Sequence, residues 1–386
     1  MIESTVSLSK SCRILYVIGQ LGKGGSERQL SYLLEGMNRE EYRPAVVVWH
    51  YDPSAFYVRH IQQIAVPVHG ISGNAPWWRK LSALRYLIKR VSPEVIHSYS
   101  FYTNFAVWLC SLGCKTLPIG SIRDSFISER RNSGQMLGRL SARLPATQIA
   151  NSSVAKGLAE ESRPPFRPVK VHLVQNGVDL DLFTPHPSLP KEPVLLAIGR
   201  LYAMKRWDRL IRAIHIVASK GLTIKAKLAG EGPLRKDLEQ QAEDLGVRHL
   251  IEFLGLRSDI CELLASCSFL VHTADEEGSP NVIIEAMACG RAVIATDVGD
   301  IPFLISDGIT GFIVHRNDEQ SLVRHMITLS NDPFACAQMG YNGRSKAVRD
   351  FGLQRFVSET LNAYRAAGWQ DGSTSRKHIV NHSSSI

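Results

Sequence analysis

Two glutamates eight positions apart flank the start of an expected helix in the second half of the chain. Glu277 precedes this helix in the run EEGSPNVIIEAMACG, and Glu285 lies in its second turn. Ser279 is expected to cap the helix, Pro280 to take the first helical position and Gly290 to follow its end. The free amides of the first turn favour phosphate oxygens, and the carboxylates can accept hydrogen bonds from sugar hydroxyls. The alternative is an ordinary helix start whose acidic residues only favour its positive end.

Two cations stand where the first strand of the second half ends. Arg200 closes the run PVLLAIGR, and Lys205 begins a helix expected over 205–219. Ligands of doubly wound sheets bind beyond the carboxyl ends of the strands, so these cations can hold a diphosphate and stabilise it as it leaves. Because a cation opposes the dipole at a helix N-terminus, Lys205 costs stability unless an anion binds. At the next strand end, Gly230 indicates close approach of the backbone to a neighbour or a ligand.

A glycine-rich turn in the first half, IGQLGKGGSERQL, joins a strand to a helix that begins near Ser26. A dinucleotide fingerprint starting at Gly22 and Gly24 requires a third glycine where the chain has Glu27. The spacing therefore excludes the dehydrogenase pattern. Gly24 and Gly25 instead suit close approach of the backbone to a phosphate across a cleft.

The elements that must position these residues are strands alternating with helices along both halves of the chain. This alternation predicts an α/β fold of two Rossmann-like, doubly wound domains facing a cleft. Four prolines between Pro185 and Pro193 forbid regular structure and mark a linker. The predicted division is a first domain over 1–183, the linker over 184–193, a second domain over 194–367 whose last helix can pack back on the first domain, and a disordered polar tail over 368–386.

Composition narrows the class of protein. The chain has 386 residues, of which 44% are hydrophobic and 21% charged, as expected for two globular domains. No run reaches the roughly 18 apolar residues of a membrane span, and no signal-peptide core precedes Arg13, so we expect a cytoplasmic protein. The seven cysteines have no metal-ligand spacing and read as reduced core residues. No Asp-x-Asp run lies at a suitable strand end, since DLD at 179–181 adjoins the linker, so no metal is expected.

Positive charge is concentrated in the first half. Residues 1–190 hold 22 Lys and Arg against 13 Asp and Glu, whereas the remainder is neutral. This asymmetry favours an anionic partner such as a membrane surface, a nucleic acid or a phosphorylated substrate. A helix expected over 75–90 suits an anionic membrane, although its apolar face also fits packing on the sheet. That face comprises Trp77, Leu81, Leu84 and Ile88, with Trp78 at its boundary and Arg85, Lys89 and Arg90 on another side.

Taken together, the motifs resemble those of the retaining glycosyltransferase family 4, also grouped as glycosyl transferases group 1, which has the GT-B fold. The resemblance extends over about residues 13–365 and is strongest over 194–315. Glu277 and Glu285 match the family's Glu-x7-Glu motif, and Arg200 and Lys205 match its phosphate-binding pair. The runs GGSER, QNGVD and GEGP also match.

The resemblance implies a role for each matching residue. The first domain would bind the acceptor and the second the donor. Many family members carry a histidine where this chain has Arg123, so the role of that arginine stays open; His97 is a second candidate, with a buried structural histidine as its alternative. The implied set is Arg200, Lys205 and Glu277 for catalysis, Gly24, Gly25, Gly230, Gly255, Asn281, Val282 and Glu285 for the donor, and His97 and Arg123 for sugar or acceptor positioning.

The expected function is metal-independent, retaining transfer of a hexose from a nucleoside-diphosphate sugar to an acceptor hydroxyl. No cofactor is expected. The acceptor is expected to be a lipid-linked or polysaccharide precursor, and the enzyme to lie peripherally on the inner face of the cell membrane. Two alternatives remain: a sugar-nucleotide epimerase of the same fold, and a non-catalytic protein that binds a sugar nucleotide or nucleic acid. No nucleic-acid-binding motif is present, so no nucleic-acid partner is expected.

Overall fold

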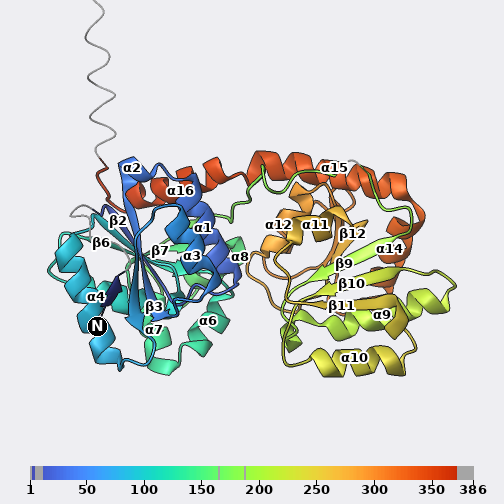
Figure 1. Ribbon diagram of the computed structural model, residues 1–386, viewed down its shortest axis with the longest axis horizontal. Helices are drawn as coiled ribbons and strands as arrows, with labels where there is room; N and C mark the ends of the chain where they lie inside the picture. Colours follow the sequence, from blue (N-terminus) through green and yellow to red (C-terminus); the bar gives the residue numbers. More distant parts are fainter. Residues whose placement is uncertain (1, 5–11, 164–165, 187, 372–386) are drawn as a thin grey trace, which may run out of the picture. The chain divides into compact units, whose positions relative to one another are not determined.

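The structure, a computed structural model, describes residues 2–4, 12–163, 166–186 and 188–371. The chain divides into two compact units, Met1–Gln175 with Gln354–Ile386 and Asn176–Leu353. Each unit is a mostly parallel sheet with helices packed on its faces (Figure 1). The predicted α/β class with two doubly wound, Rossmann-like domains is confirmed.

The described part of the first unit contains an eight-stranded sheet in the order β1-β4-β3-β2-β5-β6-β7-β8. Only the β1–β4 pairing is antiparallel among the described pairs. The strand order reverses between β2 and β5, and such a switch point is where ligands bind in this class of fold. The strands are β1 (Ile2–Ser4), β2 (Ile14–Ile18), β3 (Pro44–Tyr51), β4 (Val68–Ser72), β5 (Val95–Ser98), β6 (Leu117–Ile122), β7 (Thr147–Ala150) and β8 (Lys170–Leu173).

Helices cover both faces of this sheet because its central strands are apolar on both sides. In β2 every residue is buried: Tyr16 lies in the core that includes residues of α1 and α16, and its neighbour Leu15 lies in the core with α4. The helices are α1 (Gly25–Gly36), α2 (Arg39–Tyr42), α3 (Phe56–Gln63), α4 (Trp77–Val91), η1 (Phe101–Thr103), α5 (Asn104–Ser111), α6 (Phe126–Asn132), α7 (Gln135–Arg143), α8 (Ser153–Glu160) and α16 (Leu353–Ala366).

In its described residues the second unit has a six-stranded parallel sheet in the order β11-β10-β9-β12-β13-β14. The strands are β9 (Val194–Ile198), β10 (Lys225–Ala229), β11 (Ile251–Gly255), β12 (Phe269–His272), β13 (Ala292–Thr296) and β14 (Gly311–Val314). The helices are η2 (Ala203–Lys205), α9 (Trp207–Ser219), α10 (Arg235–Asp244), η3 (Arg248–Leu250), α11 (Ile260–Ala265), α12 (Asn281–Ala288), α13 (Ile301–Leu304), α14 (Glu319–Asn331) and α15 (Pro333–Asp350).

The proline-rich segment expected as a linker over 184–193 lies inside the second unit, because the division falls between Gln175 and Asn176. Phe183 is buried just before this segment, and Arg344 donates a hydrogen bond to its carbonyl at 2.7 Å. These contacts hold the residue that precedes the segment against α15.

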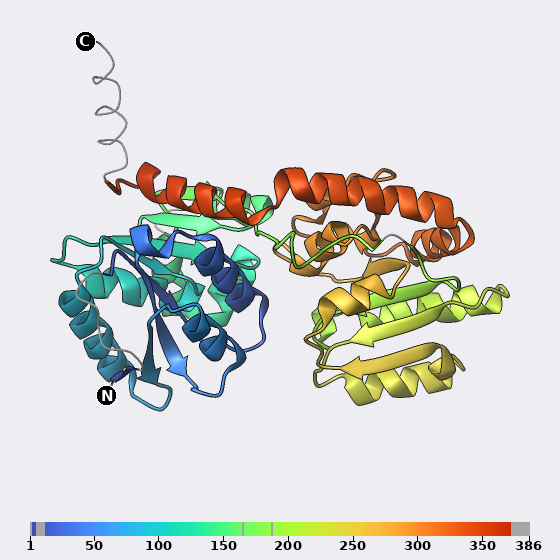
Figure 2. The same cartoon turned by 45° about the horizontal axis from the view of Figure 1, so that its top comes forward.

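The last helix, α16, returns to the first unit (Figure 2). Its Phe356 and Tyr364 are fully buried. The described chain continues past Gly368, where the predicted disordered tail begins. Trp369 is buried, and its indole N–H donates to Glu94 at 2.7 Å; the Arg13 guanidinium also pairs with Glu94. The rest of the predicted tail, 372–386, lies outside the described residues.

Candidate functional site

Arg200 is exposed at the carboxyl end of β9. Its guanidinium lies 5.4 Å from the centre of the Tyr202 ring, and its side chain is exposed. Within the part of the chain that the structure describes, it has no carboxylate partner. An exposed arginine without a counter-ion, at the edge where doubly wound sheets bind ligands, is available to an anion.

The neighbouring strand ends are held together by backbone contacts. Gly230, directly after β10, has a φ of +156°, and a Cβ there would stand 1.9 Å from the carbonyl oxygen of Gly199. The Gly230 amide donates to the carbonyl of Gly255 at 2.8 Å, and Gly255 ends β11 with a φ of +69°. The close neighbour predicted for Gly230 is therefore the backbone of the adjacent strand end, which positions Arg200.

Lys205 lies before the helix that was predicted to begin with it. It closes the short η2 turn, Arg206 then takes a φ of +53°, and α9 starts at Trp207. The Thr273 hydroxyl fixes this turn by donating to the carbonyls of Lys205 and Arg206, each at 3.0 Å. The ammonium of Lys205 forms an ion pair with Glu277, so a carboxylate of the same chain offsets its charge.

Glu277 lies between two basic side chains. Its carboxylate accepts from Lys205 and lies 2.8 Å from Nε2 of His272, the last residue of β12. The side chain is only 12% exposed. Burial raises the pKa of Glu277, but the charge of Lys205 and the hydrogen bond to His272 outweigh burial and lower it to about 2. Glu277 is thus ionised and able to accept hydrogen bonds from hydroxyl groups.

Changing Glu277 to glutamine is expected to destabilise the protein near neutral pH and to matter less as the pH falls. The carboxyl pKa drops from 4.5 to about 2 on folding. The ionised carboxylate therefore contributes on the order of 3 kcal/mol to the free energy of unfolding; this contribution is complete above pH 4.5 and is lost as the pH falls toward 2. Chemical denaturation of both proteins across this range measures it. E252Q, at an exposed glutamate, is the control. A stability difference between E277Q and wild type that does not change with pH would contradict the assignment.

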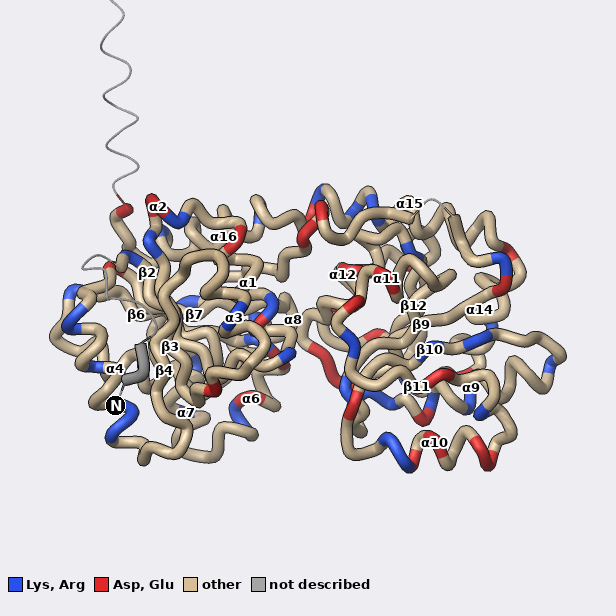
Figure 3. The backbone as a smooth tube through the Cα atoms, viewed as in Figure 1, with Lys and Arg blue, Asp and Glu red and all other residues tan. Residues whose placement is uncertain are grey.

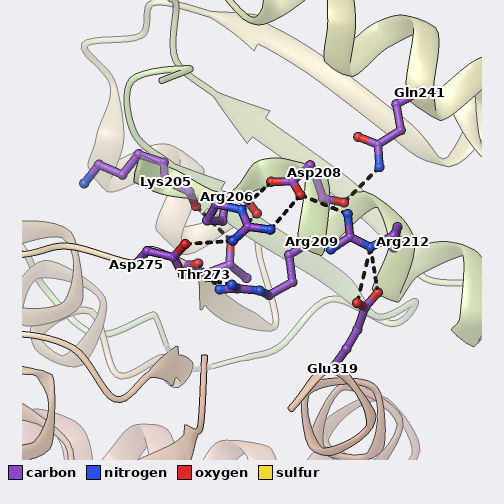
Figure 4. A network of polar contacts seen from close by, with 9 residues as sticks. All are labelled: Lys205, Arg206, Asp208, Arg209, Arg212, Gln241, Thr273, Asp275 and Glu319. Carbon is purple, nitrogen blue, oxygen red and sulfur yellow. Dashed lines mark hydrogen bonds and ion pairs between the residues drawn. The ribbon is translucent and has the colours of Figure 1, made fainter. Parts of the chain in front are cut away.

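A network of ion pairs connects the turn that carries Lys205 with the loop that carries Glu277. Asp275, two residues before Glu277, accepts from Arg206 at 2.7 Å and from Arg209 at 2.8 Å. Arg209 also donates to the carbonyl of Thr273 at 2.7 Å. The network locks the η2 turn to the loop after β12, and no sequence motif indicated it. Its members are Arg206, Asp208, Arg209, Arg212, Asp275 and Glu319 (Figure 4).

The helix after this loop, α12, begins one residue later than predicted. Pro280 is its N-cap and Asn281 its first residue, whereas Ser279 was expected to cap it. The Asn176 amide explains this start, since it donates to the Ser279 carbonyl at 3.1 Å and to Asn281 Oδ1 at 2.7 Å. Val282 and Glu285 are buried within the helix. The QNGVD run therefore helps to build the start of α12.

Gly299 supports the loop that carries Glu277, although no sequence motif indicated this residue. It has a φ of +54°, and a Cβ there would stand 2.3 Å from the Glu277 carbonyl oxygen and 2.6 Å from that of Gly278. The next residue, Asp300, donates its amide to the Gly278 carbonyl at 2.8 Å. Only glycine allows these two loops to lie this close.

In the first unit, the glycine turn before α1 already faces a carboxylate. Gly24 is the N-cap and Gly25 the first helical residue. The carboxylate of Glu27 lies over Gly24, so close that a Cβ at Gly24 would be 2.1 Å from Oε2. The phosphate approach predicted for this turn therefore requires Glu27 to move.

His97 is buried, as its structural alternative predicted. Its ring nitrogens lie 2.7 Å from the Tyr364 hydroxyl and 2.8 Å from the Ser121 hydroxyl, and the residue has no exposed surface. Burial, followed by the charge of Arg123, holds the pKa of His97 well below its usual range. A neutral histidine with both nitrogens engaged ties α16 to the first sheet.

Arg123 follows β6 and stacks on Tyr99. Its guanidinium carbon lies 3.9 Å from the centre of the Tyr99 ring, and Glu129 accepts from its backbone amide at 3.1 Å. Its Nε and Nη1 atoms are buried and have no hydrogen-bond partner among the described residues. Such groups cost free energy until a partner is supplied, which keeps Arg123 a candidate for binding a ligand.

Among the described residues, no group of three or more His, Cys, Asp and Glu side chains is arranged to hold a metal ion. None of the described helices combines the length and the apolar character needed to cross a membrane.

Two known families match the two halves of the chain. Residues 181–346 match the glycosyl transferases group 1, and residues 23–182 match glycosyltransferase family 4. Alpha-maltose-1-phosphate synthase of Mycolicibacterium smegmatis is 28% identical over 305 residues, which cover 70% of this chain and 78% of that protein. D-inositol 3-phosphate glycosyltransferase of Streptomyces avermitilis is 29% identical over 220 residues, covering 51% and 47%.

Solved structures share the fold. Anabaena HepE in complex with UDP-glucose aligns with a TM-score of 0.76 at 22% identity, covering 91% of this chain and 99% of that one. Sucrose-phosphate synthase of Thermosynechococcus elongatus aligns with a TM-score of 0.77 at 18% identity, covering 92% and 98%. The two-domain GT-B architecture that the sequence implied is thus found in both.

Proposed function

This chain belongs to the glycosyl transferases group 1, and from that premise we propose that it moves a hexose from a nucleoside-diphosphate sugar to an acceptor hydroxyl with retention of configuration. The observation that carries the proposal is the Lys205–Glu277 ion pair beside the free Arg200. It combines two cations for a diphosphate with an ionised carboxylate for sugar hydroxyls. The HepE complexes with UDP and UDP-glucose support a nucleotide-sugar donor.

In the proposed reaction the second unit stabilises the leaving group. Arg200 and Lys205 bind the donor diphosphate, helped by the amides of Asn281 and Val282 at the start of α12. Glu277 accepts from the sugar hydroxyls, and Glu285 contacts the ribose. The bond from the sugar's anomeric carbon to the diphosphate breaks as the bond to the acceptor oxygen forms on the same face. The acceptor proton goes to the departing diphosphate.

A donor panel tests this proposal. Thermal stabilisation by UDP-, GDP- and ADP-sugars identifies the base and sugar, and product analysis with and without a membrane fraction identifies the reaction. Transfer or hydrolysis with release of a nucleoside diphosphate supports a transferase. Conversion of one sugar nucleotide into another would indicate an epimerase, and binding without turnover a non-catalytic protein.

We expect activity to persist in excess EDTA. In the proposed site two fixed cations and a helix N-terminus stabilise the leaving diphosphate, so no divalent ion is required. Turnover is compared in EDTA, in EDTA followed by excess manganese or magnesium, and in untreated enzyme. Loss of turnover in EDTA that either metal restores would overturn the metal-independent mechanism.

We further propose a lipid-linked or polysaccharide-precursor acceptor reached at the inner face of the cell membrane. Support comes from α4, although its exposed face differs from the apolar face identified in the sequence. Leu84 and Ile88 pack in the core, and Arg85 donates to the carbonyls of Cys110 and Leu112. The exposed residues of α4 include Trp77, Trp78, Tyr86, Arg79, Lys89 and Arg90, and basic residues lie toward both of its ends (Figure 3).

Binding to anionic vesicles is expected at low salt and should weaken as salt rises. Aromatic and basic side chains on one exposed helix face suit lipid headgroups. In flotation assays, K89E/R90E and W78A/Y86A should each reduce the bound fraction several-fold. K220E/K236E makes the same charge change as K89E/R90E at exposed lysines of the second unit and should have little effect. A wild-type protein that ignores anionic vesicles at low salt would favour a water-soluble acceptor.

A further inference from the structure

The first unit contains an open depression of about 540 Å³ beside its glycine-rich turn. Nothing in the proposed donor site uses it. Most of the side chains that line it carry hydrogen-bond donors, and none is a carboxylate. They are Lys23, Ser54, Phe56, Arg59, His60 and Gln63.

The two permanent cations of this depression lack counter-ions. Within the described residues, neither Lys23 nor Arg59 has a carboxylate partner. Two carboxylates bond to other residues of the lining: Asp52 accepts from the Ser54 hydroxyl at 2.6 Å, and Glu35 pairs with His60 at 2.7 Å, so neither offsets the charge of Lys23 or Arg59 through a direct ion pair. Two like charges facing one cavity repel each other, so an anion bound between them is favoured.

The fold places this depression where a substrate can reach it. Lys23 lies in the loop after β2, and Arg59 lies on the helix that follows β3, so both are at the carboxyl edge of the sheet. The Tyr57 amide donates to the Leu21 carbonyl at 3.0 Å, which ties this helix to the loop. The Lys23 ammonium lies 5.2 Å from the centre of the Phe56 ring. The site is thus held in place close to the switch point of the sheet.

The glycine turn itself repels the same kind of ligand. Glu27 covers the N-terminus of α1, so a phosphate approaching there meets a carboxylate. Lys23 lies directly before Gly24, and its ammonium attracts an anion that the Glu27 carboxylate repels. An anionic group is therefore favoured in the depression rather than at the helix end.

We propose that this depression, built around Lys23 and Arg59, binds an anionic phosphate group of the acceptor substrate. The inference rests on the proposed transferase function and extends it to the acceptor. The arginine fork and the lysine ammonium neutralise the phosphate. Gln63 can complete its coordination. The acceptor hydroxyl would belong to a molecule that carries a phosphate at a fixed distance from it.

Titration of the full chain with inorganic phosphate, followed by ³¹P NMR, tests the site. Phosphate affinity should fall by about tenfold or more in K23A/R59A, because two charge contacts are lost. It should be largely restored in K23R/R59K. The control K115A/R163A removes two exposed charges from loops that precede β6 and β8, at the opposite edge of the sheet, and should change nothing. Equal binding of both free phosphate and phosphatidic acid vesicles by K23A/R59A and wild type overturns the proposal.

Two further measurements separate the sources of phosphate and the two proposals. If no variant binds free phosphate and K23A/R59A loses binding to phosphatidic acid vesicles, the phosphate belongs to a lipid headgroup. If K23A/R59A loses binding to free phosphate, the phosphate belongs to a water-soluble acceptor. Stabilisation by the donor sugar should be the same in K23A/R59A and wild type. If no donor stabilises any variant, the proposed function fails while the phosphate result stands.

Discussion

Alanine at Arg200 or Lys205 should lower turnover by about a hundredfold or more, a loss of about 3 kcal/mol in transition-state stabilisation. Each residue is assigned to the diphosphate, whose charge grows as the sugar bond breaks. The R200A variant is the cleaner test, because the side chain is exposed and has no carboxylate partner in the described chain. Its thermal stability should match that of the wild type.

K205A has a second effect that must be separated from catalysis. It removes the counter-ion of the nearly buried Glu277, so a loss of stability is expected together with the loss of turnover. K205R keeps the charge and should recover most of the stability. Steady-state kinetics with a fixed donor measure turnover, and K220A, at an exposed lysine of the second unit, is the control. Near-normal turnover in both R200A and K205A would rule out the proposed clamp.

Alanine at Gly299 is expected to destabilise the protein by roughly 3 kcal/mol or more and to reduce turnover at least about tenfold. Its Cβ would stand 2.3 Å from the Glu277 carbonyl oxygen, so the loop that carries the carboxylate must shift. Gly308 is a matched control, because it also has a positive φ, +71°, but nothing lies within 4 Å of its Cβ position.

The G308A variant should show only the backbone cost of a left-handed alanine, about 1–2 kcal/mol, with normal turnover. The difference between the two variants then measures the contact with the Glu277 loop alone. Denaturant unfolding gives the stabilities, and donor turnover gives the functional effect. Equal losses in G299A and G308A would show that the contact has no special role.

The sequence predicts well whatever depends on local pattern. Buried strands such as β2 and β9 are continuous apolar runs, and the residues that follow them are charged or glycine, so the placement of Arg200 at a strand end could be predicted. The proline-rich segment was equally visible in the sequence. That this segment belongs to the second unit could not be predicted, because this depends on a contact with Arg344, which lies more than 150 residues further along the chain.

Contacts between distant segments account for the rest. The carboxylate of Glu27 over Gly24 depends on a side-chain rotamer that spacing does not encode. His272 gave only a weak signal, a histidine closing an apolar strand five residues before Glu277. Arg85 shows the same limit: its place on the helix suggested a lipid-facing cation, yet two carbonyls of the α5 end engage it.

The return of α16 to the first unit sets the order in which the protein can fold as it is synthesised. The core of the first unit includes Phe356 and Tyr364, and His97 finds one of its two partners only on α16. These residues are synthesised after the whole second unit, which is one uninterrupted stretch, Asn176–Leu353. The second unit can therefore complete its core while the chain is still growing. The first unit, although begun earlier, has an apolar face uncovered until α16 is synthesised, and a chain cut short after Leu353 leaves that face open permanently.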